Sequence, residues 1–167
     1  MSVVEDFLEA NKQFAARFHE QRIPMIPTRK VAILTCMDAR LDLFAILGLH
    51  DGDAHIIRNA GGRAQDAIRS LAISQEMLGT REIVVIHHTN CGLATFTNES
   101  FRERLGNSLG PEAEMSARLM EFAPFEDVDQ GLIDDVDLIR ESPILRPDTI
   151  VSGLLYDVDT GELRQVV

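Results

Sequence analysis

Two short polar clusters contain the residue types that bind a metal ion. The first is Cys36-Met37-Asp38-Ala39-Arg40, and the second is His87-His88-Thr89-Asn90-Cys91-Gly92. Two cysteine thiolates and one imidazole form a ligand set that favours zinc over magnesium or calcium, because its donors are soft. Such a set leaves a fourth position open for water, as a catalytic zinc site requires. Cys36, Cys91 and a histidine of the second cluster are therefore candidate zinc ligands.

Each of these residues also has an ordinary structural explanation. A cysteine at the end of a buried strand is commonly just a small hydrophobic side chain. Asp38 could be a helix N-cap, and Arg40 could lie on the surface. A charged pair directly after Cys36 favours the metal site, however, because a metal-bound water would give the pair a partner.

Three short apolar runs predict buried strands that end at these clusters. They are Lys30–Thr35, Ala54–Arg58 and Glu82–His87. Helical patterns lie between them, at Leu41–Leu47 and Ala64–Leu78, and the second is followed by Gly79, a typical helix C-cap. This alternation predicts a parallel sheet with right-handed crossovers. Ligands bind at the carboxyl ends of strands in such sheets, so the two clusters can meet in one crevice.

The remaining segments predict helices around a final pair of strands. Helices are expected at Glu99–Leu105, Glu112–Phe122 and Val128–Arg140, and strands at Thr149–Asp157 and Glu162–Val167. An apolar stripe from Val3 to Phe18 predicts an N-terminal amphipathic helix that ends near Ile23–Pro27. We therefore expect one α/β domain over residues 1–167, with the N-terminal helix within residues 1–22 and a strand-turn-strand at the C-terminus.

The composition argues against some partners and compartments. The chain has 167 residues, with 16 Lys+Arg against 27 Asp+Glu and a net charge of −11. Clustered basic residues are what attract nucleic acids and anionic membranes, so neither is expected as a partner. The sequence contains no secretory signal and no apolar run long enough to span a bilayer. With only two cysteines, this predicts a reducing, cytoplasmic location.

The motifs together resemble the β-class carbonic anhydrases in residue type, order and spacing. They are Cys36-x-Asp38-x-Arg40, Arg58-Asn59-Ala60-Gly61 and His88-Thr89-x-Cys91-Gly92. The resemblance is strong from Val31 to Phe96 and looser as far as Gly161. It implies that Cys36, His88 and Cys91 bind one zinc ion per subunit, and that Asp38 and Arg40 form a catalytic dyad. His87 would alternate to the other side of its strand and pack there.

We therefore expect a zinc enzyme whose metal-bound hydroxide attacks the carbon of a small linear substrate. Asp38 would orient the hydroxide, and Arg40 would keep Asp38 ionised. The short chain resembles a small-sized branch of the family that contains CO2 hydratases and carbonyl sulfide hydrolases. The motifs favour neither CO2 hydration to bicarbonate nor carbonyl sulfide hydrolysis to CO2 and H2S, since the substrates differ by one atom. Carbon disulfide hydrolysis is a further alternative.

Other classes of protein fit parts of the pattern. In a non-catalytic zinc protein on the same fold, Asp38 would be a permanent fourth ligand. A thiol redox protein would use Cys36 and Cys91, but the sequence has no Cys-x-x-Cys. The family resemblance further implies a homodimer or higher homo-oligomer, in which the N-terminal helix packs on the partner subunit.

Overall fold

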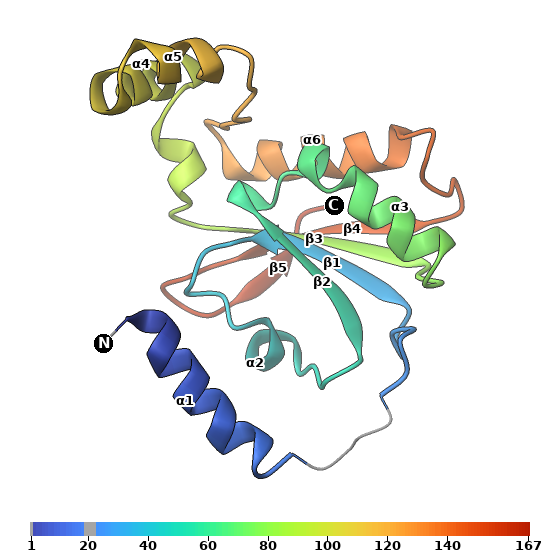
Figure 1. Cartoon of the computed structure of the whole chain (residues 1–167). Coiled ribbons are helices and arrows are strands. Elements are labelled where there is room, and N and C mark those ends of the chain that lie inside the picture. Colours follow the sequence, from blue (N-terminus) through green and yellow to red (C-terminus); the bar gives the residue numbers. More distant parts are fainter. Residues whose placement is uncertain (1, 19–22) are drawn as a thin grey trace.

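A five-stranded sheet organises the molecule, in the strand order β2-β1-β3-β4-β5 (Figure 1). The computed structural model describes residues 2–18 and 23–167, so positions 1 and 19–22 of the predicted N-terminal segment lie outside it. The parallel strands are β1 (Val31–Cys36), β2 (Ala54–Asn59), β3 (Glu82–His88) and β4 (Ile150–Tyr156). β5 (Leu163–Gln165) runs antiparallel to β4. The predicted mostly parallel α/β fold with a terminal strand-turn-strand is therefore confirmed.

Helices cover both faces of this sheet. α3 (Ile68–Glu76) and α6 (Val128–Glu141) lie on one face, and the short α2 (Leu43–Leu47) lies on the other (Figure 1). Side chains alternate along β3, so Ile83 and Val85 join the core beneath α6 whereas Ile86 joins the core beside α2. β1 lies between β2 and β3, and all six of its residues are buried. This explains why its sequence is apolar without alternation.

A helical hairpin interrupts the connection from β3 to β4. It consists of α4 (Asn98–Leu109) and α5 (Pro111–Ala117), and it projects from the sheet body (Figure 1). Gly110 joins the two helices with φ 98°, a value that favours glycine. The predicted helix Glu112–Phe122 was too long, because α5 ends at Ala117. The Arg102 guanidinium donates to the carbonyls of Ala117 and Met120, which stabilises the chain in its non-helical path.

A second predicted helix also differs in the structure. Residues 64–78 do not form one helix: a 3-10 turn, Ala64–Asp66, precedes α3, which ends at Glu76. The Ala64 N–H donates to the buried Asp135 carboxylate on α6, at 2.8 Å. This long-range contact holds the start of the segment in a tight turn, which the local apolar pattern does not reveal.

The N-terminal helix α1 (Val3–Ala15) stands apart from the sheet (Figure 1). It begins with a capping box formed by Ser2 and Glu5 and ends before Phe18, so it is shorter than the predicted apolar stripe. None of its residues is buried in the described chain, and Phe7 is 68% exposed. Within the described residues, the helices are too short or too polar to cross a bilayer.

Candidate metal centre

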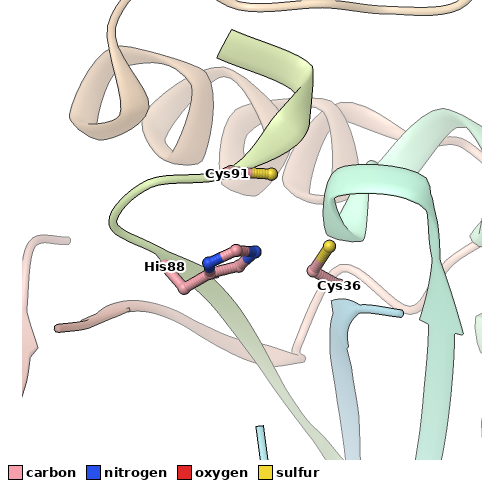
Figure 2. Close-up of side chains that lie close together, drawn as sticks. All are labelled: Cys36, His88 and Cys91. Carbon is pink, nitrogen blue, oxygen red and sulfur yellow. The ribbon is translucent and has the colours of Figure 1, made fainter. Parts of the chain in front are cut away.

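The three candidate ligands meet at the carboxyl ends of β1 and β3 (Figure 2). Cys36 ends β1, His88 ends β3, and Cys91 follows three residues later. Their ligand atoms all lie within 4.8 Å of one another, and all three residues are buried. The chain runs from β1 outward to β2 and then crosses back to β3, so the centre lies where the strand order reverses. Ligands bind at this position in open α/β sheets.

A tight glycine turn directly after β2 packs against the end of β1. Gly62 has φ +72°, and a Cβ there would lie 2.9 Å from the backbone carbonyl carbon of Thr35. Only glycine fits both the conformation and the space. Asn59 closes the turn, because its side chain accepts from the Arg63 N–H and donates to the Arg63 carbonyl, both at 2.8 Å. The turn thereby places the Gly61 backbone near the Cys36 side chain, whose pKa the Gly61 N–H lowers.

The surroundings of the two sulfurs favour one thiolate before any metal binds. Hydrogen bonding from the Cys91 side chain lowers the pKa of Cys36 to about 4 against the opposing effect of burial. His88 and the backbone N–H groups of Asp38 and Gly61 lower this pKa further. The same interaction with Cys36, together with burial, raises the pKa of Cys91. Cys36 is thus prepared as a thiolate, which is the form that binds metals.

His88 presents one ring nitrogen to the two sulfurs. Its Nδ1 lies 2.9 Å from the Thr89 carbonyl oxygen, which can only accept, so Nδ1 carries the proton. Nε2 is buried and has no hydrogen-bond partner among the described residues. A buried nitrogen lone pair without a partner fits a metal ligand, and carbonyl hydrogen bonding of the other nitrogen is the usual arrangement in metal-bound histidines.

Asp38 and Arg40 form an ion pair with two side-chain hydrogen bonds beside these donors. Arg40 donates from Nε to Asp38 Oδ1 at 2.9 Å and from Nη2 to Oδ2 at 2.7 Å. This pairing holds the pKa of the Asp38 carboxyl well below its usual range. Asp38 Oδ2 lies 3.8 Å from His88 Nε2, so the carboxylate faces the candidate ligands. The Asn90 carbonyl accepts from Arg40 Nη2 at 3.1 Å and helps to fix the guanidinium.

Arg58 is a part of the centre that the sequence analysis assigned no role. Its guanidinium donates to the carbonyl of Cys36 at 3.0 Å and to the carbonyl of Asp38 at 2.6 Å. These contacts clamp the backbone so that the Cys36 sulfur and the Asp38 carboxylate face the same space. The signal in the sequence was a charged residue at the end of a predicted buried strand.

Two cavities lie near the centre. The cavity that touches the candidate ligands His88 and Cys91 has a volume of about 350 Å³. Its other lining residues are the apolar Ala94, Phe125 and Val128 and the polar Asn90, Thr95 and Glu126. A larger cavity of about 650 Å³ lies along the α4–α5 hairpin and shares Phe125 with the first. The candidate ligands therefore open into a small space with both apolar and polar walls.

The donor set fits zinc better than it fits the alternatives. Both cysteines are free and buried, and they share the centre with an unpartnered imidazole nitrogen, as a zinc ligand set requires. A permanent Asp38 ligand is disfavoured, because both oxygens of its carboxylate are held by Arg40. The centre therefore has three protein donors and an aspartate beside them.

Comparison with known proteins gives similarity over the whole chain. A family model described as carbonic anhydrase matches residues 31–163. Beta-carbonic anhydrase 1 of Mycobacterium tuberculosis is 42% identical over 167 residues, with 99% of each chain covered. The solved carbonic anhydrase of Glaciozyma antarctica is 45% identical, with a TM-score of 0.93 and 100% of both chains covered. A carbon disulfide hydrolase of Acidianus sp. is 30% identical over 184 residues, covering 98% of this chain and 90% of that protein.

Proposed function

Because the chain belongs to the β-carbonic anhydrase family, a class of zinc lyases and hydrolases, we propose that it hydrates CO2 to bicarbonate. The observation that carries the proposal is the buried cluster of Cys36, His88 and Cys91 with the Asp38 carboxylate facing it. The carbonic anhydrases of Mycobacterium tuberculosis and Glaciozyma antarctica, at 42% and 45% identity, are more similar to the chain than the carbon disulfide hydrolase of Acidianus sp., at 30%. This favours CO2 over its sulfur analogues.

Cys36, His88 and Cys91 would hold one zinc ion in each subunit. Bound zinc would supply a Lewis acid that lowers the pKa of a water molecule at its open position. The backbone N–H groups of Asp38 and Gly61 stabilise the negative charge of the Cys36 sulfur, and the Leu93 N–H does the same for Cys91. These donors draw charge away from the sulfurs and offset part of the weaker acidity that two thiolate ligands would impose.

Asp38 orients the attacking water in this proposal. Its ionised carboxylate accepts a hydrogen bond from the water and so directs an oxygen lone pair at the substrate carbon. Arg40 keeps that carboxylate ionised and in place through its two side-chain hydrogen bonds. The apolar part of the wall of the 350 Å³ cavity, formed by Ala94, Phe125 and Val128, suits an uncharged linear molecule.

Hydrolysis of the sulfur analogue carbonyl sulfide is the second candidate. It is favoured by the relative named as a carbon disulfide hydrolase, which matches nearly the whole chain. Carbonyl sulfide with water would give CO2 and H2S through attack on the same central carbon. Discrimination would rest on the replacement of one terminal oxygen by sulfur, a small difference for an apolar pocket.

We further propose that α1 packs on a second copy of the chain. Its apolar side chains Val4, Phe7, Leu8 and Phe14 are each about 60% exposed or more. A contiguous apolar stripe of this kind is typical of an interface. A homodimer would bury it.

Stopped-flow CO2 hydration by protein of measured zinc content tests the reaction, alongside release of H2S from carbonyl sulfide by the same preparation. Fast CO2 hydration with slow sulfide release supports the first proposal. The reverse result supports the second candidate. Zinc-loaded protein that is inactive with both substrates would contradict both.

A further inference from the structure

Asp135 is a buried carboxylate that the proposed reaction does not use. It lies on α6 and is 1% exposed. Its Oδ1 accepts from the Ala64 N–H at 2.8 Å, and its Oδ2 lies 3.1 Å from Arg63 Nη1 and 3.0 Å from His87 Nε2. Burial of a carboxylate is costly unless charged or hydrogen-bonding groups compensate it. All three partners belong to segments that build the metal centre.

The contact with His87 fixes the end of β3. The strand period of two places His87 on the same side as Ile83 and Val85, facing α6, whereas the His88 ring faces the two sulfurs (Figure 2). His87 is 1% exposed and stacks on Phe125, with ring centroids 5.4 Å apart. Holding His87 against α6 therefore holds the adjacent backbone, from which the His88 ring projects.

The contacts with Arg63 and Ala64 fix the glycine turn. Arg63 is tied to Asn59 through its backbone N–H and carbonyl, which closes the turn that carries Gly61. The same turn lies directly against the end of β1, since a Cβ at Gly62 would be 3.0 Å from the Cys36 backbone nitrogen. The Asp135 carboxylate thus holds two separate segments. One is the end of β3, which carries His88, and the other is the turn after β2, which packs against Cys36.

Asp135, His87 and Arg63 are held together mainly by charge pairing and packing, and less by well-aligned hydrogen bonds. Among the described residues, Asp135 Oδ2 and both ring nitrogens of His87 lack a hydrogen-bond partner of good geometry. The Arg63 guanidinium carbon also lies 5.5 Å from the centre of the Phe125 ring. Removing the charge of Asp135 would leave the Arg63 cation without its buried counter-ion.

We propose that Asp135 is a positioning residue for the zinc site, because from α6 it fixes both the end of β3 that carries His88 and the turn that brings Gly61 to Cys36. The inference rests on the proposed zinc site. It concerns the geometry and affinity of that site, so metal binding tests it without any measurement of turnover.

The test compares Asp135→Asn with Asp137→Asn in the full-length chain. The first keeps the shape and an oxygen for the Ala64 N–H but removes the charge that faces Arg63 and His87. The second removes a charge from the same helix at a side chain that is 54% exposed. Zinc affinity is measured by competition with a chelator, and ligand geometry by the visible spectrum of the Co²⁺-substituted protein. We expect Asp135→Asn to bind zinc about 10-fold more weakly, with shifted cobalt bands, and the control to match wild type.

Several results would overturn the proposal. Wild-type protein that binds no zinc would contradict the zinc site itself and the positioning role with it. If wild type binds zinc and Asp135→Asn has the same affinity and cobalt spectrum, even with a lower Tm, only the positioning role fails. If Asp135→Asn does not fold, His87→Gln and His87→Leu replace it, because glutamine retains a donor towards Asp135. If His87→Leu binds zinc more weakly than His87→Gln, the result supports the proposal. Equal zinc affinities of the two variants overturn it.

Discussion

Arg40 donates a hydrogen bond to each oxygen of the Asp38 carboxylate, at 2.9 and 2.7 Å, and so keeps this carboxylate ionised beside the candidate metal ligands. Neither residue belongs to the set of three donors. A substitution at Asp38 can therefore change turnover without removing a metal ligand. This separation gives the first prediction.

Asp38→Ala should retain zinc and lose most turnover. The attacking water would lose its hydrogen-bond acceptor, and we expect kcat for CO2 hydration to fall about 100-fold. Stopped-flow rates are compared at equal zinc content. Asp42→Asn is the matched control, because it removes a nearby negative charge while asparagine can still cap α2. Full activity in Asp38→Ala would exclude this role for Asp38.

Cys36→Ser, His88→Ala and Cys91→Ser should each lose zinc and activity together. Each removes one of the three donors that lie within 4.8 Å of one another. Metal analysis of the purified variants checks this, with His50→Ala as the control, because His50 is 87% exposed and lies outside the donor set. Full zinc content and full rate in Cys91→Ser would contradict the proposed ligand set.

Chelation should expose thiols that zinc protects. Both cysteines are free and buried, so zinc-loaded protein should react slowly with a thiol reagent, and chelator-treated protein should react faster. Thiol titration before and after chelation measures the difference. Rapid reaction of both thiols while zinc remains bound would count against thiolate ligation.

Gly62→Ala should destabilise the fold more than Gly48→Ala. Both glycines have positive φ, +72° and +60°, so alanine is strained at either position. A Cβ at Gly62 would also lie 2.9 Å from the Thr35 backbone, whereas nothing lies within 4 Å at Gly48. We expect about 1 kcal/mol for Gly48→Ala and about 3 kcal/mol for Gly62→Ala. Thermal unfolding measures both, and equal losses would show that the close approach is unimportant.

Phe7→Asp should convert the proposed dimer into monomers. It places a charge in the exposed apolar stripe of α1, where burial by a partner would become costly. Light scattering should give twice the 18.6 kDa chain mass for wild type and the single mass for the variant. Glu9→Gln, on an exposed and charged position of the same helix, should remain dimeric. A monomeric wild type would refute the dimer.

The strands could be predicted from the sequence because their signal is local. The run that forms β1 is mostly apolar, and its observed end at Cys36 lies one residue beyond the predicted end. The boundaries of α3 and α5 could not be predicted in this way. They depend on the contact of Ala64 with Asp135, 71 positions away, and on the contact of Arg102 with the end of α5.

The candidate site could be predicted as far as strand topology determines it. Cys36 and His88 follow strands that the alternation places in one parallel sheet, and the structure brings their side chains together. The clamp by Arg58 and the buried carboxylate of Asp135 were missed. Their partners are distant in sequence, and a charged residue gives no local sign of which backbone groups it will meet.

The order of the strands also constrains when the metal centre can form during folding. Thr35 and Ile86, in the two strands that supply its donors, are joined by a buried 2.8 Å hydrogen bond across 51 positions of sequence. The intervening chain forms β2 on the far side of β1 and returns over the sheet to β3. Closing so long a crossover is an entropically costly and slow step. Zinc would therefore bind a nearly complete fold and slow global unfolding without guiding the early steps of folding.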